Sequence, residues 1–588
     1  MLKIFKNLTK KDIAMVMICI AFIIFQVWLD LKLPDYMATI TRLVQTENGK
    51  ISDILMNGGY MLLCALLSLL AAIAVGYFAS IVSADFSLIV RQLIFNKVLQ
   101  LDLHSIKHFS TSSLITRTTN DITQIELLIS LGLQMLIKAP ITAIWAITKI
   151  LNKSWQWSTL TALSVIILLT TVAILVILVM PRFKLIQTLT DKINAITREN
   201  IIGIRVIRSF NGEDFEEQRF DHANKKLTST QLFNQRSFAI MQPMMYLVLY
   251  FLTLGIYYIG ACLISLANMN DKFILFADMI VFSSYAMQII MSFLMLAMIF
   301  MILPRAQVSA HRILEVLNAP IMIHQGDQFV ENHRKGKVEF KHVYFKYPDA
   351  QNYLLEDISF VIHQGETLAI IGPTGSGKSS LIQLIPRLYE VSEGEVLVDD
   401  VNVKNYPFEV LNSKLGYVLQ KPMIFNGSVE FNVAYGTSTQ IQMNQQNITE
   451  ALEVAQAHEF VEKMPQKDQT ILAQGGTNIS GGQKQRLSIA RAIARKPEIY
   501  IFDDSFSALD YQTDSKLRKK LKEYTLDATC IIVAQRIGTI MHADKIMVLD
   551  DGKCVGFGSH RELLKNCSLY QEIAYSQLSK EELEHAWS

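Results

Sequence analysis

The chain has 588 residues, of which 51% are hydrophobic and only 18% charged, and its mean hydropathy is +0.27. This composition is too apolar for an ordinary soluble protein and excludes intrinsic disorder, so we expect a membrane domain joined to a soluble one. The net charge of +2 gives no reason to expect a nucleic-acid partner. The six cysteines are scattered without the close spacing of a metal site, and we interpret them as reduced packing residues.

Apolar segments in the first half of the chain predict six transmembrane helices. Each segment is about 17 residues or longer, enough to cross a bilayer core of ~30 Å at 1.5 Å per residue. The third span, at about 139–155, is the weakest, because Lys149 and Lys153 lie near one end, where lysines snorkel to the interface. The five segments free of Asp, Glu, Lys and Arg are 13–29, 54–84, 154–181, 237–270 and 279–304.

The basic residues between these spans predict the orientation. The two long segments between spans two and three and between spans four and five carry most of the Lys and Arg, which places them and both termini in the cytoplasm. Residues 1–11 are basic and lack a small-residue cleavage site, so we interpret them as a cytoplasmic flank and not as a signal peptide. The helices are expected to continue beyond the bilayer and to turn near 101–109 and 205–212.

The composition changes after the sixth span. We expect a transmembrane domain over 1–318 and a linker over 319–337, which contains Pro320, Gly326 and Gly336. Strand and helix signals then alternate over 338–588, which predicts an α/β domain. The predicted fold class is therefore an all-α membrane domain of six long helices fused to an α/β domain.

A phosphate-binding loop is the strongest motif. Gly-Pro-Thr-Gly-Ser-Gly-Lys-Ser, residues 372–379, follows an apolar strand at 367–371 and precedes a helical run at 380–388. Glycines in such a loop turn backbone N–H groups toward phosphates, Lys378 reaches the β- and γ-phosphate oxygens, and Ser379 binds Mg²⁺. The residues expected to contact ATP here are Gly372, Thr374, Gly375, Ser376, Gly377, Lys378, Ser379 and Ser380.

Two further motifs belong to the same chemistry. An apolar strand at 499–503 ends in Asp503, which is expected to act on the Mg²⁺ side of the loop. Ser480-Gly481-Gly482-Gln483 opens a helical stretch and forms a second helix N-terminus suited to phosphate. Two anion sites on one domain are explained if the second serves the nucleotide of a neighbouring subunit.

On these residues the chain resembles, over essentially its whole length, the ATP-binding cassette (ABC) family, whose signature reads Leu-Ser-Gly-Gly-Gln. The architecture is similar to an exporter half-transporter. The resemblance implies that Tyr347 stacks on adenine, that Gln420 contacts Mg²⁺ and the attacking water, and that Ser480 to Gln483 cap a γ-phosphate bound by the partner. It also implies that Asp510 lies in the loop between the two ATP sites and that the turns near 101–109 and 205–212 are coupling helices.

Two positions depart from the family pattern. Asp504 stands where the family places the glutamate general base, and Gln535 stands where it places the switch histidine. Displacement of a base by ~1 Å costs ~10²-fold in rate, and glutamine cannot carry the charge of an imidazolium. Both changes impair hydrolysis and spare binding, as in the degenerate-site half of heterodimeric bacterial multidrug exporters. A slow homodimer in which Asp504 still serves as base is the alternative.

The sixth span carries methionines on one helical arc, Met287, Met291, Met295 and Met298. Such side chains suit a promiscuous apolar cavity, although ordinary helix packing or lipid contact is the simpler explanation. The sequence thus predicts ATP-driven export of hydrophobic or amphipathic small molecules across the cell membrane, with a second, non-identical half-transporter as partner. Lipid export, peptide export and a non-transport ATP-gated sensor are the alternatives.

Overall fold

The computed structural model describes residues 9–45, 50–151, 154–327, 335–436 and 445–578. The chain divides into two compact units. We call them the helical unit, Met1–Gln100 with Phe109–Ala319, and the α/β unit, Leu101–His108 with Pro320–Ser588.

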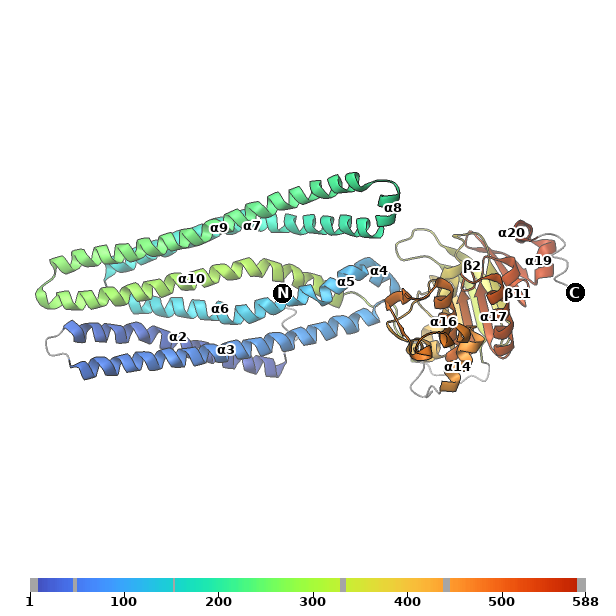
Figure 1. Cartoon of the computed structure of the whole chain (residues 1–588), viewed down its shortest axis with the longest axis horizontal. Coiled ribbons are helices and arrows are strands. Elements are labelled where there is room, and N and C mark those ends of the chain that lie inside the picture. Colours follow the sequence, from blue (N-terminus) through green and yellow to red (C-terminus); the bar gives the residue numbers. More distant parts are fainter. Residues whose placement is uncertain (1–8, 46–49, 152–153, 328–334, 437–444, 579–588) are drawn as a thin grey trace. The chain divides into compact units, whose positions relative to one another are not determined.

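Six helices in the described part of the chain are long and apolar enough to cross a membrane, which confirms the predicted number of spans. They lie side by side in three pairs, α2 with α3, α6 with α10 and α7 with α9 (Figure 1). Their bounds are α2 Lys10–Gln45, α3 Ile51–Gln100, α6 Asn120–Leu151, α7 Trp155–Ile202, α9 Glu213–Leu266 and α10 Met269–Leu317. Three short helices connect them, α4 Leu103–Phe109, α5 Thr111–Thr118 and α8 Ile204–Ser209.

The third span differs from the prediction. The predicted end at 155 is wrong, because α6 runs from Asn120 to Leu151 and Trp155 already belongs to α7. Lys138 lies 3.2 Å from a carboxylate oxygen of Asp30, and Lys149 lies 2.8 Å from one of Asp35. Since α2 supplies an anion for each lysine, the helix carries both cations without interruption. The predicted contribution of Lys153 lies outside the described residues.

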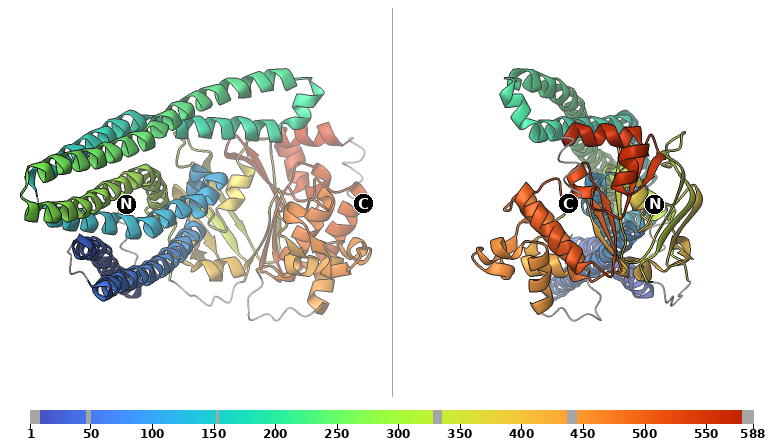
Figure 2. Two further views of the ribbon diagram at one scale, coloured as in Figure 1. Left: turned by 60° about the vertical axis from the view of Figure 1, so that its left-hand side comes forward. Right: turned by 90° about the vertical axis from the view of Figure 1, so that its right-hand side faces the viewer.

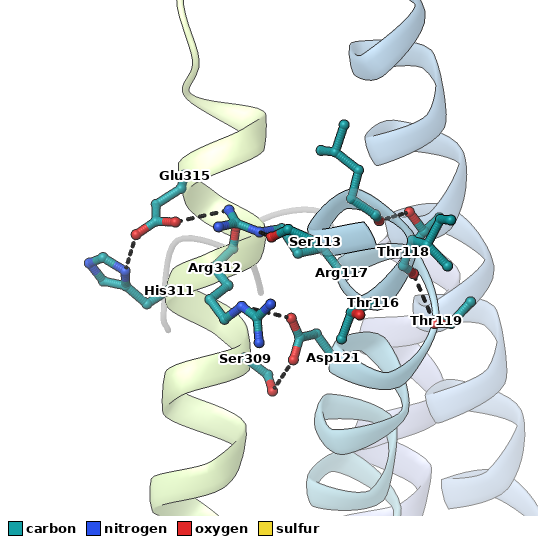
Figure 3. Close-up of polar contacts among 12 residues, drawn as sticks. Ser113, Thr116, Arg117, Thr118, Thr119, Asp121, Ser309, His311, Arg312 and Glu315 are labelled. Atoms are coloured by element: carbon teal, nitrogen blue, oxygen red, sulfur yellow. Dashed lines mark hydrogen bonds and ion pairs between the residues drawn. The ribbon is translucent and has the colours of Figure 1, made fainter. Parts of the chain in front are cut away.

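A polar network ties α5 and the start of α6 to the last turns of α10 (Figure 3). Ser309 Oγ donates to Asp121 Oδ1 at 2.8 Å, and Arg312 Nε lies 3.3 Å from Asp121 Oδ2. Arg117 donates to the Arg312 carbonyl at 2.6 Å and lies 2.9 Å from Glu315. Asp121 is only 6% exposed, so its charge depends on these partners.

The α/β unit contains two large sheets. In the six-stranded sheet, of order β12-β11-β3-β10-β9-β6, every pair is parallel except β12 with β11. The four-stranded sheet, of order β2-β1-β4-β5, is antiparallel. The strands are β1 Val338–Phe345, β2 Leu355–Ile362, β3 Thr367–Ile371, β4 Glu393–Val398, β5 Val401–Asn402, β6 Leu415–Val418, β9 Ile499–Asp503, β10 Thr529–Val533, β11 Lys545–Asp550 and β12 Lys553–Gly558; the short β7 Gly427–Ser428 and β8 Ile471–Leu472 form a separate pair.

The six-stranded sheet is covered on both faces. Figure 2 shows the orange helices on one side of it and the yellow strands of the antiparallel sheet on the other. Because both faces are covered, β3 and β9 are buried along nearly their whole length and read as continuous apolar runs. The helices of this unit are α11 Lys378–Gln383, α12 Phe408–Ser413, α13 Val429–Ala434, α14 Gln445–Val454, α15 His458–Glu462, α16 Gly481–Ala494, α17 Tyr511–Tyr524, α18 Ile537–Ile540, α19 His560–Asn566 and α20 Ser568–Gln577.

Helix α4, near the first predicted turn, packs with the α/β unit. Leu103 contacts the main apolar core of that unit. Lys107 Nζ donates to the Tyr389 hydroxyl at 3.2 Å, and His104 lies 3.6 Å from Asp349. The sequence-based division assigns these residues to the membrane domain, whereas their contacts are those of the α/β unit. Helix α8 lies in the second predicted turn, and its coupling role stays a prediction.

Candidate nucleotide site

The predicted phosphate loop connects β3 to α11. Neighbouring atoms leave no room for a side chain at two of its glycines. A Cβ at Gly372 would lie 1.9 Å from the Leu549 carbonyl oxygen. Gly377 has φ +96°, and a Cβ there would lie 2.7 Å from Leu355. Helix α11 ends at Gln383, earlier than the predicted helical run. All eight residues predicted to contact ATP thus lie in one loop and the first turn after it.

Lys378 turns back onto this loop. Its ammonium donates to the carbonyl of Gly372 at 2.8 Å and to that of Pro373 at 2.6 Å. Burial lowers the pKa of Lys378, an effect opposed by the nearby carboxylates of Asp504 and Asp503. The positive charge that phosphate oxygens require is thereby held at the loop by carbonyl acceptors.

The two groups expected on the metal side are in direct contact. Ser379 Oγ donates to Asp503 Oδ1 at 2.8 Å. Asp503 closes β9 and is 3% exposed; burial raises its pKa, and the bond from Ser379 opposes that rise. A hydroxyl and a carboxylate are hard oxygen donors, so this pair fits Mg²⁺ with phosphate oxygens and water as the remaining ligands.

The two departures from the family pattern touch each other. Gln535 Nε2 donates to Asp504 Oδ2 at 2.9 Å. The contact follows from the sheet, because β9 and β10 are parallel neighbours in which Asp503 pairs with Val533. Burial raises the pKa of Asp504, while hydrogen bonds from Gln420 and Ser507 lower it. The carboxylate at the base position is therefore engaged by two side-chain amides.

Tyr347, predicted to stack on adenine, lies beside the loop. Its hydroxyl shares a hydrogen bond with Ser380 Oγ at 2.8 Å. Its ring packs edge-on against Phe345 at 5.0 Å and Tyr389 at 5.2 Å between centroids. Tyr389, which also contacts Lys107 of α4, is a residue that sequence reasoning missed, and no motif signals it.

The predicted signature forms the start of α16. Ser480 is its N-cap, and Ser480 with Gln483 makes a capping box: Ser480 N donates to Gln483 Oε1 at 2.9 Å, and Gln483 N donates to Ser480 Oγ at 3.3 Å. A Cβ at Gly481 would meet no heavy atom within 4 Å, so the backbone is open there. Among the described residues, we find no hydrogen bond or ion pair that joins this group to the phosphate loop.

The loop before α17 lies next to the signature. A Cβ at Gly482 would lie 3.3 Å from the Ala508 carbonyl oxygen. Asp510 caps α17 by accepting from Thr513 N at 2.9 Å, and this bond lowers the pKa of Asp510. Asp510, which the sequence predicts to lie in the loop between the two ATP sites, is thus also the N-cap of α17.

The methionines predicted to line a substrate cavity are mostly on an open face of α10. Met287, Met291 and Met298 are exposed, while Met295 is partly buried. This exposure leaves the predicted substrate role of the four side chains a prediction.

Comparison with known proteins identifies the family. Residues 16–293 match the family model described as ABC transporter transmembrane region, and residues 355–507 match the one described as ABC transporter. An uncharacterized ABC transporter ATP-binding protein of Mycobacterium tuberculosis is 38% identical over 549 residues, 92% of this chain and 93% of that protein. The ATP-dependent lipid A-core flippase of Pseudomonas aeruginosa is 31% identical over 489 residues, 82% of this chain and 79% of that protein.

A solved structure shows the same fold. The structure of a bacterial Atm1-family ABC exporter with ATP bound matches with a TM-score of 0.78 at 23% identity, over 96% of each chain. Six apolar helices are followed by the sheets and motifs of an ABC ATPase domain, which couples ATP hydrolysis to transport. The chain therefore belongs to the ABC transporter family, as a multi-pass membrane exporter half-transporter.

Proposed function

We propose that this chain is the slowly hydrolysing half of a heterodimeric ABC exporter for hydrophobic or amphipathic compounds. The contact between Gln535 and Asp504 carries the proposal. An aspartate at this position reaches less far than a glutamate and is already engaged by amide donors, and the glutamine supplies no positive charge. Lys378 and Ser379 of the phosphate loop keep the residue types of the family pattern, so binding of ATP is spared.

The signature supports the second half of the proposal. Ser480 and Gln483 are locked by the capping box, and the open backbone at Gly481 lies at a helix N-terminus. Such an end attracts a γ-phosphate carried by another chain. The chain would thus complete an ATP site on a non-identical partner that hydrolyses faster than its own.

Mg²⁺ and ATP are assigned to the same group of residues. Ser379 and Asp503 would hold the cation together with Gln420, whose side chain already reaches the Asp504 carboxylate. We place the site, both termini and the α8 turn on the cytoplasmic side of the cell membrane, because the basic residues gather there.

The test compares this chain alone with this chain purified with its genomic neighbour. Photolabelling with an ATP analogue measures binding, and phosphate release measures turnover. We expect labelling in both samples, fast turnover only in the pair, and loss of labelling of this chain in Lys378→Ala. Brisk turnover by this chain alone would refute the heterodimer and favour a homodimer with Asp504 as base.

Lipid export is the second candidate function. The observation that favours it is the similarity to lipid A-core flippases of Pseudomonas aeruginosa and Aromatoleum aromaticum, 31% and 29% identical. Proteoliposomes supplied from outside with a cationic dye, a fluorescent lipid or a labelled peptide separate the candidates. We expect ATP-dependent accumulation of the dye; transfer of the lipid alone would favour the flippase, the peptide alone a peptide exporter, and none a sensor.

A further inference from the structure

A pair of opposite charges lies among the apolar helices of the helical unit. The ammonium of Lys138 on α6 lies 3.2 Å from Asp30 Oδ2 on α2. Asp30 Oδ1 accepts a hydrogen bond from Ser68 Oγ of α3 at 2.5 Å, and the Asp30 carbonyl accepts one from Gln288 Nε2 of α10 at 3.3 Å. Four helices thus meet at Asp30.

The partners of Asp30 place the pair at the depth of the hydrocarbon core. Ser68 lies near the middle of the charge-free run 54–84 of α3, roughly 20 Å of helix from the nearer end of that run. Gln288 lies in the charge-free run 279–304 of α10, roughly 13 Å from its nearer end. Charged side chains at such depth face protein or a water-filled space, because contact with lipid is too costly.

The helices of this chain leave the pair partly uncovered. The side chains of Lys138 and Asp30 are 24% and 28% exposed. On α10, Met291 lies one turn from Gln288, and Met287 lies one turn from Met291; these methionines are 43% and 45% exposed. Since the exposed charges cannot face lipid, this face of α2, α6 and α10 borders a water-filled path through the exporter.

The two charges are held with different firmness. The Asp30 carboxylate sits on a short side chain and is fixed by the hydrogen bond from Ser68. Lys138 reaches it on a flexible four-carbon stem, and the ion pair at 3.2 Å is the one polar contact of its ammonium among the described residues. The carboxylate is therefore the fixed charge, and the ammonium is the one that another cation can replace.

We propose that Asp30 is the counter-ion for a positively charged group of the exported compound. That group takes the place of the Lys138 ammonium at Asp30 Oδ2, and Lys138 turns into the water of the path. The apolar part of the compound lies on Met287 and Met291, whose thioether side chains adapt to varied shapes. Exchange of one cation for another leaves the carboxylate paired throughout. The inference rests on the proposed export function and narrows its substrates to cationic amphipathic compounds.

The test measures binding of the monocationic dye rhodamine 6G to the full-length transporter with its partner chain, in phosphatidylcholine nanodiscs without ATP. Fluorescence polarisation gives the dissociation constant, with empty nanodiscs as the blank. In Asp30→Asn we expect this constant to rise about tenfold, the loss of one charge-assisted contact. In Lys138→Gln it should fall about threefold, because the competing cation is gone. The uncharged dye Nile red should bind both variants and the natural chain within about twofold of one another.

Asp35→Asn is the matched control, because it removes the same charge from the same helix. Asp35 already accepts a hydrogen bond on each carboxylate oxygen, from the Tyr285 hydroxyl at 2.6 Å and from Lys149 at 2.8 Å. A new cation therefore competes poorly at Asp35, and the dissociation constant of rhodamine 6G should change less than about twofold.

Opposite effects of Asp30→Asn and Lys138→Gln distinguish a counter-ion from a structural ion pair, because loss of a structural pair would weaken binding in both. Should Asp30→Asn fail to assemble, the tighter binding expected of Lys138→Gln still decides. Weaker binding in Lys138→Gln, equal weakening by Asp30→Asn and Asp35→Asn, or equal effects on the two dyes would overturn the inference and leave the proposed export function in place. Failure of the natural transporter to bind either dye would contradict the proposed function and the inference together.

Discussion

The double substitution Asp504→Glu with Gln535→His should accelerate hydrolysis at this chain's own ATP site. Glutamate carries its carboxylate about 1 Å further toward the nucleotide, and removal of Gln535 releases the oxygen now held at 2.9 Å. A displacement of that size is worth ~10²-fold in rate, or about 2.7 kcal/mol at 1.36 kcal/mol per tenfold. Asp504 has φ +45°, a conformation that Asp tolerates better than Glu, so about 1 kcal/mol of folding stability should be lost.

The assay is single-turnover ATP hydrolysis in the assembled transporter with the partner's own ATP site inactivated. Photolabelling with the ATP analogue runs in parallel and should be unchanged. Asp504→Glu alone should recover only part of the rate, because Gln535 still reaches the carboxylate. Unchanged labelling together with less than a threefold gain in the double variant would refute the idea that these two residues limit the reaction.

Three further outcomes follow from the described contacts. Burial lowers the pKa of Lys378, so this side chain loses its positive charge at a lower pH than an ordinary lysine does. ATP affinity, measured by equilibrium dialysis, should therefore fall in that pH range in the natural chain and hold in Lys378→Arg. Parallel curves of affinity against pH for the two proteins would contradict this. Ser480→Ala should lower the thermal stability by about 1 kcal/mol through loss of the N-cap and slow the partner's hydrolysis, with ATP binding by this chain unaffected; a larger loss of its own binding would speak against the signature role. Arg312→Ala should destabilise the protein by about 3 kcal/mol in denaturant titration, because Asp121 keeps a buried charge, and adding Asp121→Asn should restore part of the loss; additive effects would rule out the pairing.

Local pattern was sufficient for the strands and loop that build the nucleotide site. The expected strands at 367–371 and 499–503 coincide with β3 and β9, because a parallel strand buried on both faces is apolar throughout. The phosphate loop is equally local: its glycines, lysine and serine follow one another along the chain.

Contacts between residues that are far apart along the chain could not be predicted from the sequence. The bond from Gln535 to Asp504 depends on the register of β9 against β10, and nothing in either segment encodes that register alone. The third span was predicted too far along the chain for the same reason. Lys138 was interpreted as the end of an apolar segment, because the sequence does not show that Asp30 of α2 pairs with it. Tyr389 was missed because its partner Lys107 is 282 residues away.

That separation of 282 residues also sets an order of events during synthesis. A ribosome adding 5–20 residues per second needs roughly 15–55 s to advance from Lys107 to Tyr389. Helix α4 has seven residues, too few to persist as an isolated helix in water. The nascent chain therefore carries Leu103 without the apolar core that it later contacts while the later membrane spans are inserted, so packing of α4 within the α/β unit is a late step.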